Sequence, residues 1–152
     1  MERTLAIVKP DAVTRGKTGE IIRRFEEAGL RICGLKMVHL SKQEAEQFYR
    51  VHRKRSFFES LTVFMSSGPS VVIVFEGEAA ISTVRAIMGP TDPAQASPGS
   101  IRRDVGTSIE RNAVHGSDSP ESAAYEVPYF FAGFETFEYA RVNPTDGRGE
   151  KV

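Results

Sequence analysis

The chain has 152 residues, of which 40% are hydrophobic and 26% are charged, enough for one folded domain with its own core. Its 20 basic and 20 acidic side chains cancel, which argues against bulk electrostatic binding to nucleic acids or membranes. The single cysteine, Cys33, excludes an intrachain disulfide, and the 3 histidines are too scattered for a zinc site. We find neither a signal peptide nor an apolar run of membrane length, so we expect a cytoplasmic protein.

Strands and helices alternate along the sequence. Apolar, β-branched runs bounded by Pro or Gly predict the strands, and apolar residues at helical spacing followed by Gly predict the helices. A capping box at 41–44 marks the start of one helix. In chain order the predictions are a strand over 5–8, a helix over 18–28, a strand over 31–40, helices over 41–51 and 57–65, a strand over 71–75, and helices over 78–88 and 120–131.

Two segments lack these patterns. Residues 91–108 are rich in Pro, Gly, Ser and Thr and predict a long loop; since it carries Arg102 and Arg103, we expect it to be functional. The polar tail from about 143 is expected to be mobile. We see no repeat and no linker, so 1–152 is interpreted as a single domain, with the alternating elements forming an α/β or α+β sandwich.

Residues 11–18 resemble a phosphate-binding P-loop, because they follow a strand, precede a helix and end in Gly-Lys-Thr. The first glycine of that motif is replaced by Asp11, whose charge and side chain oppose a backbone cradle for phosphate. A surface loop in which Thr18 caps a helix is therefore the favoured interpretation. A P-loop-type nucleotidase or kinase using Lys17 remains the alternative.

The most informative residue is His115, which lies just before a strong helix start. Ser119 suits the N-cap and Pro120 the first helical position. Backbone N–H groups at a helix start favour anions, and an imidazole is largely neutral and nucleophilic at cell pH. This combination favours phosphoryl chemistry. Further candidates lie at strand ends, helix edges and the long loop, although each alone has an ordinary structural explanation: Lys9, Tyr49, Arg55, Phe57, Arg85, Thr91, Arg102, Asn112 and Glu126.

The string Asn-Ala-Val-His-Gly-Ser-Asp-Ser at 112–119 resembles the active-site signature of nucleoside diphosphate kinases. The resemblance covers about residues 2–131 and implies a ferredoxin-like core, a four-stranded antiparallel sheet covered by helices. It also implies a ping-pong reaction in which the γ-phosphate of a nucleoside triphosphate, mainly ATP, passes through a phosphohistidine to a nucleoside diphosphate. Homo-oligomers are implied too, as hexamers or tetramers built from a common dimer. Further similar segments, in the family's order, are 2–11, 48–49, 55–58, 67–69, 89–94 and 99–102.

The resemblance assigns catalytic roles by position. His115 corresponds to the nucleophile, expected to attack through Nδ1. Glu126 corresponds to the carboxylate that orients the imidazole, supported by Ser117. Tyr49 corresponds to a tyrosine beside the histidine, and Lys9 is expected to help polarise the transferred phosphate.

The same resemblance implies a nucleotide site. A phosphate clamp suits phosphoryl transfer, because the protein supplies mainly positioning and charge. Mg²⁺ is implied as a cofactor held mainly by the nucleotide phosphates, with Asp118 reaching it through water. The expected nucleotide contacts are Lys9 and Asn112 to the ribose, Arg55, Arg85, Thr91 and Arg102 to the phosphates, and Phe57, Ile109 and Leu61 around the base.

Three residues depart from the family pattern. Ser56 replaces a usual proline and is expected to loosen the nucleotide clamp and the subunit contacts. Arg103 adds a charge beside Arg102, and Pro128 is expected to kink or shorten the last helix. From Ala132 onward there is no clear match, which leaves tetramer against hexamer open. A non-catalytic binding module of the same fold is a further alternative, disfavoured by the intact His115.

Overall fold

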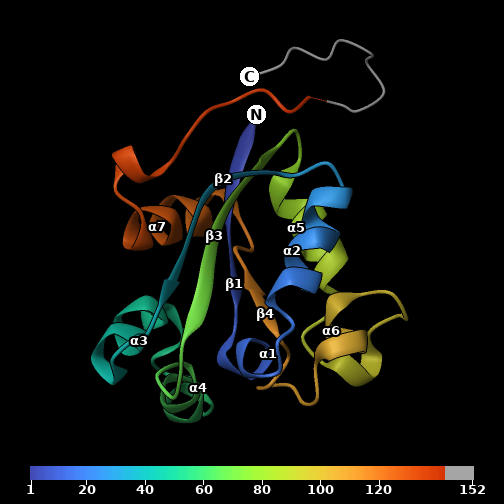
Figure 1. Cartoon of the computed structure of the whole chain (residues 1–152). Helices are drawn as coiled ribbons and strands as arrows, with labels where there is room; N and C mark the ends of the chain where they lie inside the picture. The colour runs from blue at the N-terminus through green and yellow to red at the C-terminus, as the bar shows by residue number, and fades with distance from the viewer. Residues whose placement is uncertain (143–152) are drawn as a thin grey trace.

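The computed structural model describes residues 1–142, so the expected mobile tail from 143 lies outside the described residues. Four strands form one antiparallel sheet in the order β2-β3-β1-β4 (Figure 1). This confirms the ferredoxin-like fold with a four-stranded antiparallel sheet. The strands are β1 (Glu2–Val8), β2 (Arg31–Val38), β3 (Ser70–Gly77) and β4 (Val114–Gly116).

Helices cover both faces of the sheet, because side chains alternate along its strands. On β1, Ala6 and Val8 pack in one core with α2, α5 and α6, whereas Leu5 and Ile7 pack in the other with α3, α4 and α7 (Figure 1). The helices are α1 (Pro10–Thr14), α2 (Thr18–Glu27), α3 (Lys42–Phe48), α4 (Phe58–Met65), α5 (Ala80–Met88), α6 (Ile101–Val105) and α7 (Pro120–Phe130), with short 3₁₀ turns η1 (Arg50–His52), η2 (Pro93–Gln95) and η3 (Gly133–Glu135).

The predicted long loop is wrong in part, because it contains η2 and α6. Ser100 caps α6 by accepting a hydrogen bond from Arg103 N, and Asp92 caps η2 by accepting one from Ala94 N. Elements this short give no periodic signal. The same reason explains why α1 and the three-residue strand β4 were not predicted.

Pro128 does not end α7, which continues to Phe130. The proline lies in the last turn of the helix, where only one backbone donor is lost. None of the helices within residues 1–142 combines the length and hydropathy needed to span a bilayer. Cys33 is a buried free thiol, as its apolar neighbours indicate.

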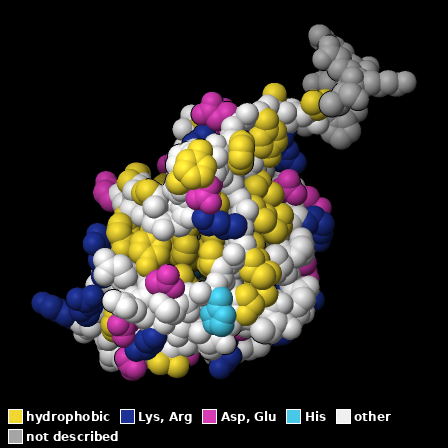
Figure 2. Space-filling model, turned by 60° about the vertical axis from the view of Figure 1, so that its left-hand side comes forward, with side chains coloured by type: hydrophobic (Ala, Val, Ile, Leu, Met, Phe, Trp, Pro, Cys, Tyr) yellow, Lys and Arg dark blue, Asp and Glu magenta, His cyan; other side chains and the backbone are white. Residues whose placement is uncertain are grey.

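After α7 the chain runs beside β2, which is an edge strand of the sheet. Phe137 N donates to Cys33 O at 2.8 Å, and the Arg31 guanidinium donates to Tyr139 O. The view in Figure 2 shows many hydrophobic side chains on the molecular surface. The exposed hydrophobic residues include Leu35, Met37, Phe134, Phe137 and Tyr139.

Candidate active site

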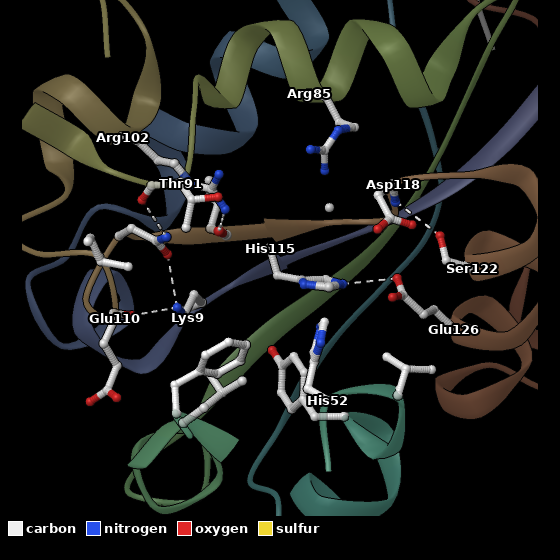
Figure 3. A pocket seen from close by; sticks show the side chains of 18 residues that line it. Lys9, His52, Arg85, Thr91, Arg102, Glu110, His115, Asp118, Ser122 and Glu126 are labelled. Atoms are coloured by element: carbon white, nitrogen blue, oxygen red, sulfur yellow. Dashed lines mark hydrogen bonds and ion pairs between the residues drawn. The ribbon is translucent and has the colours of Figure 1, made fainter. Parts of the chain in front are cut away.

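A cavity of about 400 Å³ opens where β1 and β4 meet the loops around α3, α4, α5 and α6. Its volume is that of a small-molecule site. The structure brings together at this cavity most of the residues singled out in the sequence (Figure 3). Those that line it are Lys9, Tyr49, Phe57, Leu61, Arg85, Thr91, Arg102, Ile109, Asn112, His115, Asp118 and Glu126.

His115 lies in β4, and its ring is fixed by a carboxylate from α7. Its Nε2 lies 3.0 Å from Glu126 Oε2, and Ser117 Oγ donates to the same oxygen at 2.6 Å. Ser117 is fully buried behind this contact and does not line the cavity. With Nε2 directed at the carboxylate, Nδ1 is the ring nitrogen left for a ligand, since it has no hydrogen-bond partner among the described residues.

Two aromatic rings hold the imidazole edge-on. The His115 ring centroid lies 5.4 Å from that of Phe48 and 5.8 Å from that of Tyr49, at interplanar angles of 72° and 90°. Burial raises the pKa of Tyr49 well above its usual value, and the negative charge of Glu126 adds to the shift. Tyr49 is therefore a neutral phenol that packs beside the histidine.

Lys9 and Asn112 form a hydrogen-bonded pair at the other side of the cavity. Lys9 Nζ donates to Asn112 Oδ1 at 2.9 Å and to Glu110 O at 2.6 Å, while Asn112 Nδ2 donates to Thr91 O at 3.0 Å (Figure 3). Burial lowers the pKa of Lys9 to about 8, against the opposing charge of Asp11. Lys9 is thus a buried cation with neutral hydrogen-bond partners.

Arg102 and Arg85 place further positive charge at the cavity. Arg102 is 8% exposed and donates to Gly89 O at 3.1 Å and Val114 O at 2.9 Å. Burial, and then the charge of Arg85, lower the pKa of Arg102 to about 10. Arg85 reaches from α5 into the cavity above His115 (Figure 3). An anion entering between them would be attracted to both guanidinium groups.

Arg55 is the predicted phosphate contact that the structure does not place at the cavity. It is absent from the lining, and its guanidinium lies 5.7 Å from the centroid of the Phe57 ring. His52, which is not among the predicted site residues, also lines the cavity. Its ring lies 5.5 Å from that of Phe57, and its pKa is lowered by burial and by the neighbouring His115. Its spacing of three residues from Tyr49, one helical turn, is the signal that could have found it.

Asp118 lies in the turn between β4 and α7. A side-chain hydrogen bond with Ser122 lowers its pKa, so the carboxylate is charged at neutral pH. Within residues 1–142, no group of three or more His, Cys, Asp or Glu side chains is placed to hold a metal ion. A metal bound here would need most of its ligands from another source, such as phosphate oxygens.

The whole arrangement matches a known family. A family model described as nucleoside diphosphate kinase matches residues 2–136. The chain belongs to the nucleoside diphosphate kinase family. Its activity is therefore the transfer of a γ-phosphate from a nucleoside triphosphate to a nucleoside diphosphate, through the family's ping-pong reaction.

Individual relatives agree with this. The nucleoside diphosphate kinases of Desulfosudis oleivorans and Geobacter sulfurreducens are each 60% identical over 135 residues, which is 89% of this chain and 97% and 98% of theirs. The Aquifex aeolicus nucleoside diphosphate kinase structure is 52% identical, with a TM-score of 0.88 over 90% of this chain and 99% of that one. A Halobacterium salinarum nucleoside diphosphate kinase solved in complex with CDP is 39% identical. Its TM-score is 0.89, and the match covers 92% of this chain and 93% of that one.

In this nucleoside diphosphate kinase the P-loop alternative is wrong. The segment after β1 forms α1, so its backbone donors are already used: Ala12 N and Val13 N donate to Lys9 O, both at 3.0 Å. Lys17 pairs with Glu20 at 3.1 Å and does not line the cavity.

Two departures from the family pattern lie outside the cavity lining. Ser56 is exposed. The Arg103 guanidinium donates to Ala94 O at 3.4 Å rather than reaching the cavity. Neither residue alters the charges that line the site.

Proposed function

We propose that His115 is the nucleophile of this nucleoside diphosphate kinase and that it attacks through Nδ1. The observation that carries this role is the 3.0 Å contact between Nε2 and Glu126, which leaves Nδ1 as the free nitrogen at the cavity. The Nδ1 lone pair forms a bond to the γ-phosphorus while the bond to the β,γ-bridging oxygen breaks. The electrons of that bond leave with the nucleoside diphosphate.

Glu126 and Ser117 stabilise the charge that this step places on the ring. The proton stays on Nε2 and donates to Glu126, so the positive charge of the phosphorylated imidazole faces a carboxylate. Ser117, which donates to that carboxylate at 2.6 Å, fixes its rotamer. In the second half-reaction a terminal oxygen of the acceptor diphosphate attacks the phosphorus, and the P–N bond breaks to restore neutral His115.

The cations of the cavity supply the remaining stabilisation. Phosphoryl transfer requires mainly positioning and charge, and Lys9, Arg85 and Arg102 provide both. Asn112 accepts a hydrogen bond from Lys9 and donates one to Thr91 O. Thr91 and Asn112 complete the proposed contacts to phosphate and ribose. Arg55 does not line the cavity, but its guanidinium lies beside the ring of Phe57, which does. We therefore keep Arg55 among the proposed phosphate contacts.

A base is proposed to stack on Phe57, with Ile109 on its other side and Leu61 nearby. Phe57 and Ile109 are 42% and 60% exposed, so this end of the cavity is open. Stacking tolerates every base because each has a π-face. The CDP complex of the Halobacterium salinarum relative supports a nucleoside diphosphate as the ligand.

Mg²⁺ is the proposed cofactor, entering with the nucleotide. It would neutralise phosphate charge when bound. The donor set fits an ion held mainly by phosphates, because Asp118 is a charged carboxylate without a cluster of other acidic residues in the described part of the chain. Asp118 is proposed to act on the ion through a water molecule.

We also propose a homo-oligomer, hexamer or tetramer, built from dimers in the cytoplasm. The edge position of β2 and its exposed Leu35 and Met37 support association. The buried free thiol of Cys33 suits a reducing compartment.

The test is incubation with γ-labelled ATP and Mg²⁺, followed by detection of label on the protein. We expect label that is acid-labile and base-stable, maps to His115, is discharged by GDP or CDP, and is missing from folded His115→Ala. Lys17→Ala is the matched control and should be labelled like the wild type. Label or turnover retained in His115→Ala would refute the proposed nucleophile.

A further inference from the structure

The backbone is strained at the residue that lies two positions before His115. Ala113 has φ +72°, and within residues 1–142 it is the one non-glycine residue with a positive φ. Val114 N donates to Asn112 O at 2.9 Å, so residues 112–114 form a γ-turn centred on Ala113. Such a conformation persists only where the surrounding structure holds it.

Two groups at the end of β1 hold this turn. Asp11 Oδ2 accepts a hydrogen bond from Ala113 N at 3.1 Å, and Lys9 N donates to Ala113 O at 2.9 Å. Asp11 is 7% exposed and Ala113 is fully buried. The other carboxylate oxygen, Asp11 Oδ1, is buried and has no hydrogen-bond partner in the described chain. Burying a carboxylate that accepts only one backbone hydrogen bond costs free energy of folding. The contact with Ala113 N therefore has a specific role.

The turn connects the two halves of the active site. On one side of it, Asn112 pairs with Lys9 Nζ at 2.9 Å. On the other side, His115 continues into β4 opposite Ile7. If Ala113 relaxed to an ordinary extended φ, the direction of the chain would change between these residues, so Asn112 and His115 could no longer face one nucleotide together.

We propose that Asp11 is a positioning residue for phosphoryl transfer, because its carboxylate holds the γ-turn at Ala113 that orients Asn112 and His115. Asp11 is not among the residues that line the cavity, so it acts through the turn. This inference rests on the proposed role of His115. It also gives a function to the residue that distinguishes this segment from a P-loop.

Asp11 has one other way to influence the site, through its negative charge. That charge raises the pKa of Lys9 against the larger effect of burial. Asp11→Asn separates the two effects, because the amide oxygen can still accept from Ala113 N while the charge is lost. If the hydrogen bond is what matters, Asn substitutes for Asp and Ala does not.

The experiment measures the rate constant of His115 phosphorylation at saturating ATP and Mg²⁺, per folded protein and well below each variant's Tm. We expect a fall of about 10- to 100-fold in Asp11→Ala, since small displacements of reacting groups cost this much. Asp11→Asn should stay within about threefold of the wild type, because it keeps the acceptor. Adding Ala113→Gly to Asp11→Ala should restore most of the lost rate, because glycine adopts a positive φ without strain.

Glu2→Ala is the matched control. Glu2 Oε2 also accepts a hydrogen bond from a backbone donor, Ile81 N at 2.8 Å, but at the opposite end of β1. Loss of that contact should lower Tm and leave the phosphorylation rate per folded protein unchanged. If Asp11→Ala does not fold, Asp11→Ser replaces it, since serine removes the carboxylate and keeps a polar group in the buried position.

Three results would overturn the inference: an unchanged rate in Asp11→Ala, a loss in Asp11→Asn as large as in Asp11→Ala, or no recovery on adding Ala113→Gly. In each of these three cases the wild-type protein would still be phosphorylated on His115. A wild type that is never phosphorylated would instead refute the proposed function, so the two failures are distinguishable.

Discussion

At the amino-terminal end of β1 a buried carboxylate lies between two guanidinium groups. At the carboxyl end two buried cations, Lys9 and Arg102, form no ion pair with any acidic side chain of residues 1–142. Glu76, 6% exposed, accepts from Arg3 Nε at 2.8 Å and also from Arg31. The hydrogen bond from Arg3 lowers the pKa of Glu76, and the same bond raises that of Arg3. We call these three residues the Glu76 clamp.

The hydrogen bonds of these two cations within the described residues all go to neutral groups. Lys9 donates to an amide and a carbonyl oxygen, and Arg102 donates to two carbonyl oxygens. Burial lowers the pKa of both, to about 8 and about 10. In the Glu76 clamp the buried carboxylate is ion-paired in the free protein and contributes to stability, whereas the active site keeps positive charge that nucleotide phosphates would neutralise. Such preorganised charge is what electrostatic catalysis requires.

The largest expected effect is a loss of activity that distinguishes the buried carboxylate of Glu126 from that of Glu76. Glu126→Gln keeps a hydrogen-bond acceptor for His115 Nε2 but removes the negative charge that faces the phosphorylated ring. We expect kcat to fall about 100-fold, with little change in Tm. Steady-state kinetics and thermal unfolding of Glu126→Gln and Glu76→Gln, side by side, check this. Equal activity of the two variants would remove the distinction between a catalytic and a structural carboxylate.

The next effect concerns the unpaired charge of Lys9. Because its pKa in the folded protein is about 8, against an ordinary 10.5, Lys9 loses its charge above pH 8. We expect kcat/KM to fall about tenfold per pH unit above that point. In Lys9→Ala this decrease of kcat/KM at high pH should be missing. The free energy of unfolding should change in the opposite direction and rise with pH. The cost of burying charged Lys9 is fully present below pH 8 and decreases between 8 and 10.5. A flat kcat/KM profile from pH 7 to 9.5 would contradict the lowered pKa.

A smaller effect is expected from the Glu76 clamp itself. Glu76→Gln removes the charge between Arg3 and Arg31, so Tm should fall by roughly 3–8 °C. Activity should change by less than about twofold, because the clamp lies at the far end of β1. Differential scanning calorimetry and initial rates measure the two quantities. A loss of activity matching that of Glu126→Gln would show that the ends of the strand are coupled.

The sequence predicted the long elements and most of the cavity lining, because these depend on periodicity and on a specific motif. It did not predict β4 or α6, whose three and five residues give no periodic signal. It also missed the role of Asp11. A hydrogen bond across 102 positions to a strained Ala113 depends on the tertiary fold, and nothing local in the sequence reveals it.

The smallest expected effect is the response of the Glu76 clamp to acid. Glu76 has a lowered pKa in the folded protein, so the stability it contributes is complete above its unfolded value near 4.5 and is lost as the pH falls through the folded value. The difference in urea midpoint between wild type and Glu76→Gln should therefore be largest at pH 7 and shrink below pH 4.5. Glu59→Gln is a useful control, because that carboxylate pairs with Lys42 while 75% exposed, and exposed pairs contribute little. If the difference between wild type and Glu76→Gln is the same at pH 7 and in acid, the loss comes from altered packing at position 76 and not from its charge.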